Sequence, residues 1–135
     1  MAIKKKVIDA SVVVKWFMDE EYSDRALELL FQHGRGEIIL VVPEFCFLEI
    51  MNVLRYKRKD IQALAETNKN LWGYQLHVEK VDAFLLEKAC VLALKYDLTV
   101  YDAVYLAIAQ LYGTYLITAD KKLAQQPSAI LIEKM

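Results

Sequence analysis

Apolar runs alternate with helical patterns along the whole chain. Short runs rich in Val, Ile and Leu predict strands at residues 5–10, 37–42, 76–81, 114–119 and 128–134. Apolar residues at helical spacing fill the segments between these runs. Strands that alternate with helices need crossover connections, so the pattern predicts a parallel sheet covered by helices on both faces.

Capping residues and helix breakers mark where the predicted helices begin and end. Ser11 and Asp60 are suited to cap the helices that follow them, and Pro43 is suited to a first helical turn. Gly34 and Gly113 are suited to helix C-termini. The apolar faces predicted from the spacing are Leu27, Leu30 and Phe31; Ile61, Leu64, Ala65 and Trp72; Leu85, Ala89, Leu92 and Tyr96; and Val104, Ala107, Ile108 and Leu111.

Composition favours a folded protein without indicating a partner. A chain of 135 residues predicts one domain over residues 1–135, and 56% hydrophobic with 26% charged residues excludes a disordered chain. The formal net charge of −1 argues neither for nor against nucleic acid. Cys46 and Cys90 fall in apolar helical patterns without zinc-motif spacing, so both are predicted to be buried free thiols of a cytoplasmic protein. No apolar run is long enough for a signal peptide or a membrane span.

Four carboxylates occupy positions that need an explanation. Asp9 and Asp120 each follow an apolar run, so both are expected at the carboxyl ends of strands. In an open parallel sheet, ligands bind at that edge, next to the point where the strand order reverses. Asp102 lies in the first turn of a predicted helix. Glu49 lies inside an apolar helix with no cation one turn away, so a buried Glu49 needs a partner from elsewhere or a proton.

Each acid also has a purely structural explanation. Asp9 and Asp120 can each cap the helix that follows, and Asp102 can close a capping box with Thr99. Glu49 can lie at the edge of its helix and face solvent. These explanations are independent of one another, whereas one metal site accounts for all four acids together.

A shared metal site is chemically coherent. Mg²⁺ and Mn²⁺ prefer oxygen ligands, and one or two such ions offset the repulsion between neighbouring carboxylates. Metals held in this way lower the pKa of a bound water and stabilise charge on a phosphodiester. No arrangement for nucleophilic catalysis is evident, because His33 and His77 are expected to be surface or hydrogen-bonded residues.

The segments around these acids resemble the PIN domain nucleases, and specifically the VapC-type toxins of bacterial and archaeal toxin–antitoxin pairs. The likeness is carried, in the family's order, by VIDASVVVKWF, VPEFCFLEIMNVL, LTVYDAVYLAIA and YLITADKKLA. It spans essentially the whole chain, although residues 55–97 are not diagnostic. The resemblance implies a three-layer α/β/α sandwich on a short, mainly parallel central sheet.

The resemblance also implies site residues, a cofactor and partners. The residues that match the family's catalytic and metal-binding acids are Asp9, Glu49, Asp102 and Asp120. Ser11 and Thr118 match hydroxyl positions that flank the metal. The likeness therefore implies an endoribonuclease dependent on Mg²⁺ or Mn²⁺, a homodimer, and neutralisation by a cognate antitoxin protein.

Basic residues near these segments are candidates for holding the RNA backbone. Arg55, Lys57 and Arg58 close the helix that carries Glu49, and Lys121 directly follows Asp120. The first three have an equally good structural explanation, because cations stabilise helix C-termini. The aromatic residues expected in the core or at an interface, rather than stacked on bases, are Trp16, Trp72, Tyr101 and Tyr105.

Three other functions compete with the toxin interpretation. A housekeeping PIN-type nuclease in RNA processing shares the same site. A non-catalytic interaction protein on the same fold would use the acids only as caps. A phosphoryl-transfer domain fits poorly. Haloacid-dehalogenase-type phosphatases need a second aspartate at the position of Ser11, and receiver domains need an acidic pair near the first strand, where VIDAS offers one acid, and a lysine after the last strand.

Overall fold

A sheet of five parallel strands forms the centre of the protein in a computed structural model that describes residues 3–135. The strands are β1 (Lys4–Ile8), β2 (Ile38–Pro43), β3 (His77–Glu79), β4 (Leu116–Thr118) and β5 (Ala129–Leu131). Their order across the sheet is β3-β2-β1-β4-β5. From β1 the chain adds β2 and β3 on one side of the sheet and then β4 and β5 on the other side. The strand order therefore reverses between β1 and β4.

Helices connect the strands throughout. They are α1 (Ala10–Val13), the 3₁₀ turn η1 (Val14–Trp16), α2 (Ser23–Gly34), α3 (Phe45–Lys57), α4 (Ile61–Gly73), α5 (Ala83–Tyr96), α6 (Val100–Leu111), α7 (Lys121–Ala124) and the 3₁₀ turn η2 (Ile132–Lys134). All five predicted strands and the alternation with helices are confirmed. None of the helices in residues 3–135 combines the length and the apolar composition needed to cross a bilayer.

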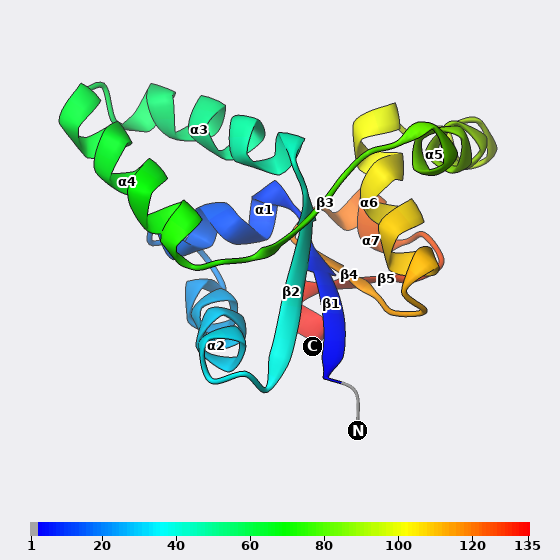
Figure 1. Cartoon of the computed structure of the whole chain (residues 1–135), viewed down its shortest axis with the longest axis horizontal. Helices are drawn as coiled ribbons and strands as arrows, with labels where there is room; N and C mark the ends of the chain where they lie inside the picture. The colour runs from blue at the N-terminus through cyan, green and yellow to red at the C-terminus, as the bar shows by residue number, and fades with distance from the viewer. Residues whose placement is uncertain (1–2) are drawn as a thin grey trace.

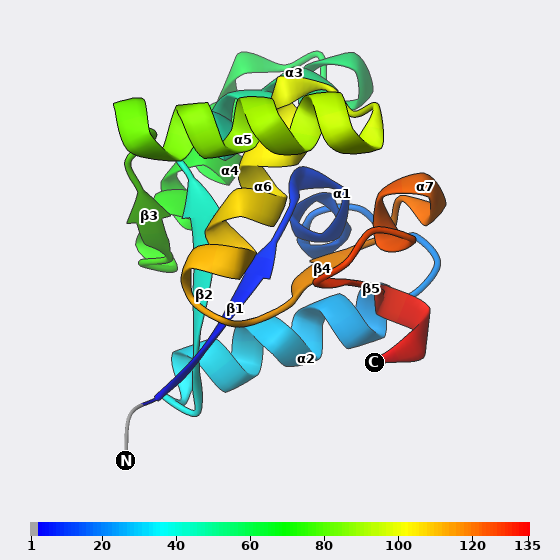
Figure 2. The ribbon, with the colours of Figure 1, turned by 90° about the vertical axis from the view of Figure 1, so that its right-hand side faces the viewer.

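The helices form a layer on each face of the sheet. On one face α6 packs against β1, β2 and β4, and α5 packs on the outside of α6. On the other face α2 packs on β2, and α1 with η1 joins the sheet to α3 and α4 (Figure 1). Figure 2 shows the same arrangement from the side, with α3 and α5 beyond the end of the sheet where β1 runs into α1. This is the predicted α/β/α sandwich.

Burial explains why β1 and α6 lie at the centre. Val7 of β1 pairs with Val41 of β2 on one side and with Leu116 of β4 on the other, and all three side chains are fully buried. In α6 every residue of the stretch 103–109 is buried. Its alanines let the backbone approach the sheet closely. A helix that is apolar on all sides is expected to be buried in the core.

Two predicted helix starts are wrong. The cap of α1 is Asp9 rather than Ser11, which lies inside the helix. Pro43 ends β2 instead of opening α3, which begins at Phe45. A proline is tolerated at a strand end because little of the hydrogen-bond ladder continues beyond it. Asp60 does cap α4, through a hydrogen bond from the Gln62 amide.

The predicted buried faces are right for α5 and partly wrong elsewhere. Leu85, Ala89 and Leu92 are buried as expected. The predicted core residues that are instead exposed are Phe31, Ile61, Trp72 and Leu111, at 47–76%, and Ala65. The reason is clearest for α4, which packs mainly on α3 and buries only a narrow stripe at Thr67 and Leu71. Trp16 and Tyr105 lie in the core, whereas Tyr101 and Trp72 are largely exposed.

The two cysteines differ in burial. Cys46 is buried, and burial raises the pKa of its thiol to about 12, so it stays protonated at neutral pH. Cys90 is exposed on α5, which contradicts the prediction that both thiols are buried. Its position follows from the exposed side of α5, where apolar residues also reach the surface.

Candidate active site

Asp9 is the most buried of the four acids and has both carboxylate oxygens occupied. The Ser11 hydroxyl donates to Asp9 Oδ1 and the Thr118 hydroxyl donates to Asp9 Oδ2, each at 2.5 Å. These hydroxyls in turn accept backbone N–H groups, Ser11 from Ala119 at 2.9 Å and Thr118 from Asp120 at 3.0 Å. Each hydroxyl therefore has a fixed acceptor role toward the backbone and directs its proton to Asp9.

This network joins the ends of β1 and β4, the two strands between which the strand order reverses. Asp9 also caps α1 through a hydrogen bond from the Val12 amide at 3.3 Å. Burial nevertheless raises the pKa of Asp9 to about 6, because the surrounding hydrogen bonds only partly offset the loss of hydration. An ionised Asp9 is therefore costly for the fold to hold without a cation.

Glu49 lies half-buried on α3 and finds its partner on α6. The Tyr105 hydroxyl donates to Glu49 Oε1 at 2.7 Å. Burial raises the pKa of Glu49, the hydrogen bond from Tyr105 lowers it, and the negative charge of Asp102 raises it further. Glu49 has no cation nearby on its own helix, and the partner that it finds is an uncharged hydroxyl donor.

Asp102 and Asp120 complete the group from α6 and from the end of β4. Thr99 caps α6 by accepting the Asp102 amide at 3.1 Å, which gives the Thr99–Asp102 pairing of the predicted capping box. Burial and the nearby charge of Asp120 raise the pKa of Asp102. Asp120 Oδ1 caps α7 by accepting the amides of Lys122 and Leu123. Asp9 and Asp120 are therefore helix caps, and Asp102 lies in the first turn of a helix capped by Thr99.

Asp102 lies close enough to interact electrostatically with each of the other three acids. Its charge raises the pKa of Asp9 and of Glu49, and the charge of Asp120 raises that of Asp102. None of the four takes part in an ion pair within residues 3–135. Across the same residues, no three carboxylate, imidazole or thiol groups are already drawn together as a complete metal-ligand set. Uncompensated carboxylates at a strand edge nevertheless suit a hard divalent cation, whose charge offsets their repulsion.

Comparison with known proteins identifies the family of this chain. The PIN domain family matches residues 6–128. Ribonuclease VapC3 of Pyrobaculum aerophilum is 31% identical to the chain over 133 residues, covering 94% of this chain and 98% of the relative. The chain belongs to the PIN domain family, in its VapC group. The resemblance inferred from the sequence is thus confirmed.

Solved structures agree on the fold of this PIN domain. The crystal structure of PAE2754 from Pyrobaculum aerophilum superposes with a TM-score of 0.73 at 24% identity, covering 99% of this chain and 93% of that chain. A toxin–antitoxin complex from Klebsiella pneumoniae contains a chain that superposes with a TM-score of 0.72 at 20% identity, covering 94% and 97%. Both support the α/β/α sandwich.

The basic candidates of this PIN domain fall into two groups. Arg55, Lys57 and Lys121 are exposed, and the guanidinium of Arg55 lies over the ring of Tyr56 at 4.6 Å. Arg58 instead uses its guanidinium within the fold, where it donates to the Thr67 hydroxyl at 2.8 Å and to the Phe17 carbonyl. Arg58 therefore has a structural role, and the other three cations remain the candidates for RNA.

Replacing Arg58 with alanine is expected to lower the free energy of unfolding by about 1.5–3 kcal/mol, because two charge-assisted hydrogen bonds between α3, α4 and η1 are lost. Urea unfolding followed by circular dichroism measures this loss. Arg55→Ala, on the same helix end, serves as the control and is expected to change stability by no more than about 0.5 kcal/mol. Equal stability of the two variants would contradict the structural role of Arg58.

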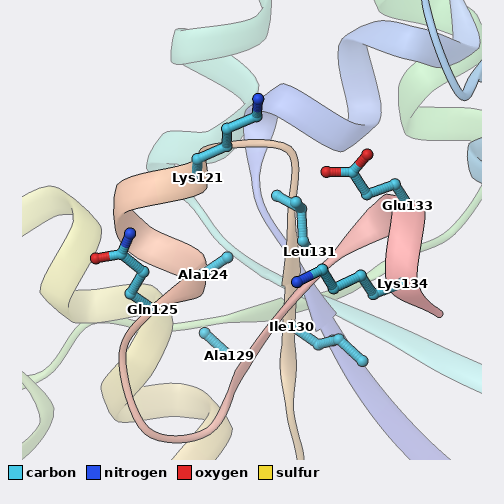
Figure 3. A pocket seen from close by; sticks show the side chains of 8 residues that line it. All are labelled: Lys121, Ala124, Gln125, Ala129, Ile130, Leu131, Glu133 and Lys134. Atoms are coloured by element: carbon cyan, nitrogen blue, oxygen red, sulfur yellow. The ribbon is translucent and has the colours of Figure 1, made fainter.

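A separate hollow of about 380 Å³ lies between α7 and β5 (Figure 3). Its lining is Lys121, Ala124, Gln125, Ala129, Ile130, Leu131, Glu133 and Lys134. None of the four acids lines it, so it is distinct from the acidic site. Lys121, which lines this hollow, is exposed and directly follows Asp120 in the chain.

Tyr105 is the residue of this region whose role the sequence does not indicate. The sequence predicts only that it lies in the core or at an interface, and its ring is indeed buried. Two side chains without a hydrogen-bond partner in their local sequence could have revealed its contact with Glu49. A tyrosine hydroxyl inside an alanine-rich buried helix needs an acceptor, and a glutamate inside an apolar helix needs a donor.

Proposed function

We propose that the protein is the toxin of a toxin–antitoxin pair and cleaves RNA phosphodiester bonds with the help of Mg²⁺ or Mn²⁺. The observation that carries this proposal is that Asp102 interacts electrostatically with Asp9, Glu49 and Asp120, which come from three other elements, and that none of the four forms an ion pair within residues 3–135. Membership of the VapC group supports the same activity, since the relative at 31% identity is a ribonuclease.

In this proposal the four carboxylates would hold the metal, and the bound metal would supply an activated water and offset the charge of the phosphate. Ser11 and Thr118 keep the Asp9 carboxylate in one orientation. Asp120 uses one oxygen to cap α7 and has its second oxygen for the site. The exposed cations Arg55, Lys57 and Lys121 attract the RNA backbone.

The wild-type protein is expected to cleave total RNA into discrete fragments with Mn²⁺ or Mg²⁺, and to be inactive with chelator. Asp102→Asn is expected to lower the cleavage rate about a hundredfold or more, because the charge central to the site is lost. Denaturing electrophoresis of the RNA measures both effects.

Asp82→Asn provides the matched control for this assay. Asp82 is also a helix cap, accepting the Leu85 amide at 2.9 Å, but it opens α5 outside the acidic group. Asparagine is a good cap, so this variant is expected to cleave like the wild type. If neither the wild type nor Asp82→Asn cleaves RNA, and Mn²⁺ does not raise their melting temperature, the interaction-only alternative is favoured.

We further propose that the protein acts in the cytoplasm as a homodimer neutralised by an antitoxin protein. Large apolar side chains on the outer side of α5 support a partner surface, because Phe84, Val91 and Leu94 are 68%, 59% and 88% exposed. A groove of about 690 Å³ between α3 and α4, with Phe47 and Trp72 in its lining, offers a second apolar surface. A chain of the toxin–antitoxin complex from Klebsiella pneumoniae shares this fold, which supports an antitoxin as the partner that covers one of these two apolar surfaces.

A further inference from the structure

Tyr105 is the one polar side chain in the buried stretch 103–109 of α6. Its exposure is 1%, and its neighbours in this stretch are Ala, Val, Leu and Ile. A buried phenol without an acceptor is costly, and here the hydroxyl donates to Glu49 Oε1 at 2.7 Å. Replacement by phenylalanine would keep the ring and lose the contacts of the hydroxyl with Glu49 and with the buried Cys46 thiol, so the packing of the ring does not itself require the hydroxyl.

The contact joins the two helical layers at the edge of the sheet where the acids gather. Glu49 belongs to α3, on the side of α1 and α2, whereas Tyr105 belongs to α6 on the opposite face. Within the described residues, no second hydrogen bond reaches the Glu49 carboxylate. Oε1 is therefore held by Tyr105, and in this part of the chain Oε2 has no donor that competes with a ligand.

The Tyr105 ring is itself held by α3. The Phe45 ring, one helical turn before Glu49, meets it edge-on with centroids 5.5 Å apart and planes at 84°. Tyr105 thus contacts α3 through its ring and through its hydroxyl. With the ring held in this way, the hydroxyl oxygen keeps its position beside Glu49.

Asp102 lies one helical turn before Tyr105 on α6. One rigid helix therefore carries one acid of the site directly and holds a second acid through a hydrogen bond. A glutamate side chain that moves freely loses rotamer entropy when it binds a ligand, whereas a side chain that is already fixed loses less.

We propose that Tyr105 is a positioning residue, whose hydroxyl fixes the Glu49 carboxylate in the orientation in which it binds the metal. This inference rests on the proposed metal-dependent activity and adds a residue outside the acidic set. Groups that orient metal ligands by hydrogen bonds typically contribute tenfold to hundredfold to metal affinity.

The test is Mn²⁺ binding by isothermal titration calorimetry to the full chain, which needs no RNA. Tyr105→Phe is expected to raise the Mn²⁺ dissociation constant about tenfold, with an unchanged circular dichroism spectrum in chelator. Tyr112→Phe is the matched control. Tyr112 follows α6 at its other end and donates its hydroxyl to Glu79 at 2.6 Å, away from the acids, so its loss is expected to leave Mn²⁺ affinity unchanged.

A double-mutant comparison separates positioning from a general structural effect. In a Glu49→Ala background Tyr105 has no carboxylate to position, so adding Tyr105→Phe is expected to leave Mn²⁺ affinity as it is in Glu49→Ala alone. An equal dissociation constant for Tyr105→Phe and wild type, or a tenfold effect that persists without Glu49, overturns the inference while leaving the proposed function intact. If the wild type itself binds no Mn²⁺, the metal-dependent function and this inference both fail.

Discussion

Replacing Asp9 with asparagine is expected to stabilise the metal-free protein and to slow its cleavage of RNA by about 10²–10³-fold. Burial raises the pKa of Asp9 from 3.8 to about 6, so the charged form present at neutral pH is held at a cost. Each unit of such a shift corresponds to about 1.4 kcal/mol, and asparagine removes the charge while matching the Ser11 and Thr118 hydroxyls less well. A net gain of about 1–2 kcal/mol in unfolding free energy is expected.

Thermal unfolding in chelator and RNA cleavage in Mn²⁺ measure the two effects on the same preparation. Cleavage is expected to fall about 10²–10³-fold, because a proposed metal ligand at the end of β1 is lost. Asp82→Asn again serves as the control and is expected to change neither property strongly. An Asp9→Asn protein that unfolds at a lower temperature than wild type, or that cleaves RNA at the wild-type rate, would contradict the role given to Asp9.

Acidification is expected to stabilise the metal-free protein and to weaken its binding of Mn²⁺. A folded-state pKa above the unfolded value contributes stability that is present below about 3.8 and is lost as the pH rises through about 6. Burial raises the pKa values of Glu49 and Asp102 in the same direction. With a pKa of about 6, roughly a tenth of Asp9 is ionised at about pH 5, so Mn²⁺ affinity falls at least about tenfold relative to about pH 7.5.

Melting temperatures with and without Mn²⁺ across this pH range provide the measurement. The metal-free wild type is expected to melt at a higher temperature near pH 5 than near neutrality, and the rise caused by Mn²⁺ is expected to shrink on acidification. Asp9→Asn is expected to show a flatter pH dependence without metal. A rise caused by Mn²⁺ that is the same at both ends of the range would argue against these carboxylates as its ligands.

The sequence predicts the fold well because strand and helix periods differ clearly in this chain. Runs such as IILVV have no helical spacing, and the predicted face of α5 at Leu85, Ala89 and Leu92 is the one that is buried. Burial on α4 is not predictable from periodicity, because α4 packs mainly against one other helix, α3, and most of its surface stays exposed. The exposed Cys90 has the same cause, since α5 covers α6 with one side only.

The acids themselves are predictable because their local sequences conflict with simple packing. The sequence does not provide the partner of each acid. The contact between Glu49 and Tyr105 joins residues 56 positions apart, and the contact between Asp9 and Thr118 joins residues 109 apart. The prediction that Arg58 contacts RNA rests on a local run of basic residues. In the structure its guanidinium donates a hydrogen bond to the carbonyl of Phe17, 41 residues earlier. The metal-binding roles of the acids stay predictions.

The pairing of β1 with β4 has a consequence for the order in which the chain is synthesised. β1 emerges from the ribosome first, but the strand that covers its second edge arrives only with residues 116–118. Until then the growing chain carries Asp9 without the Thr118 hydroxyl and lacks Asp120 altogether. A nascent chain therefore holds an open sheet edge and an incomplete acidic group, and both are completed by the same late strand.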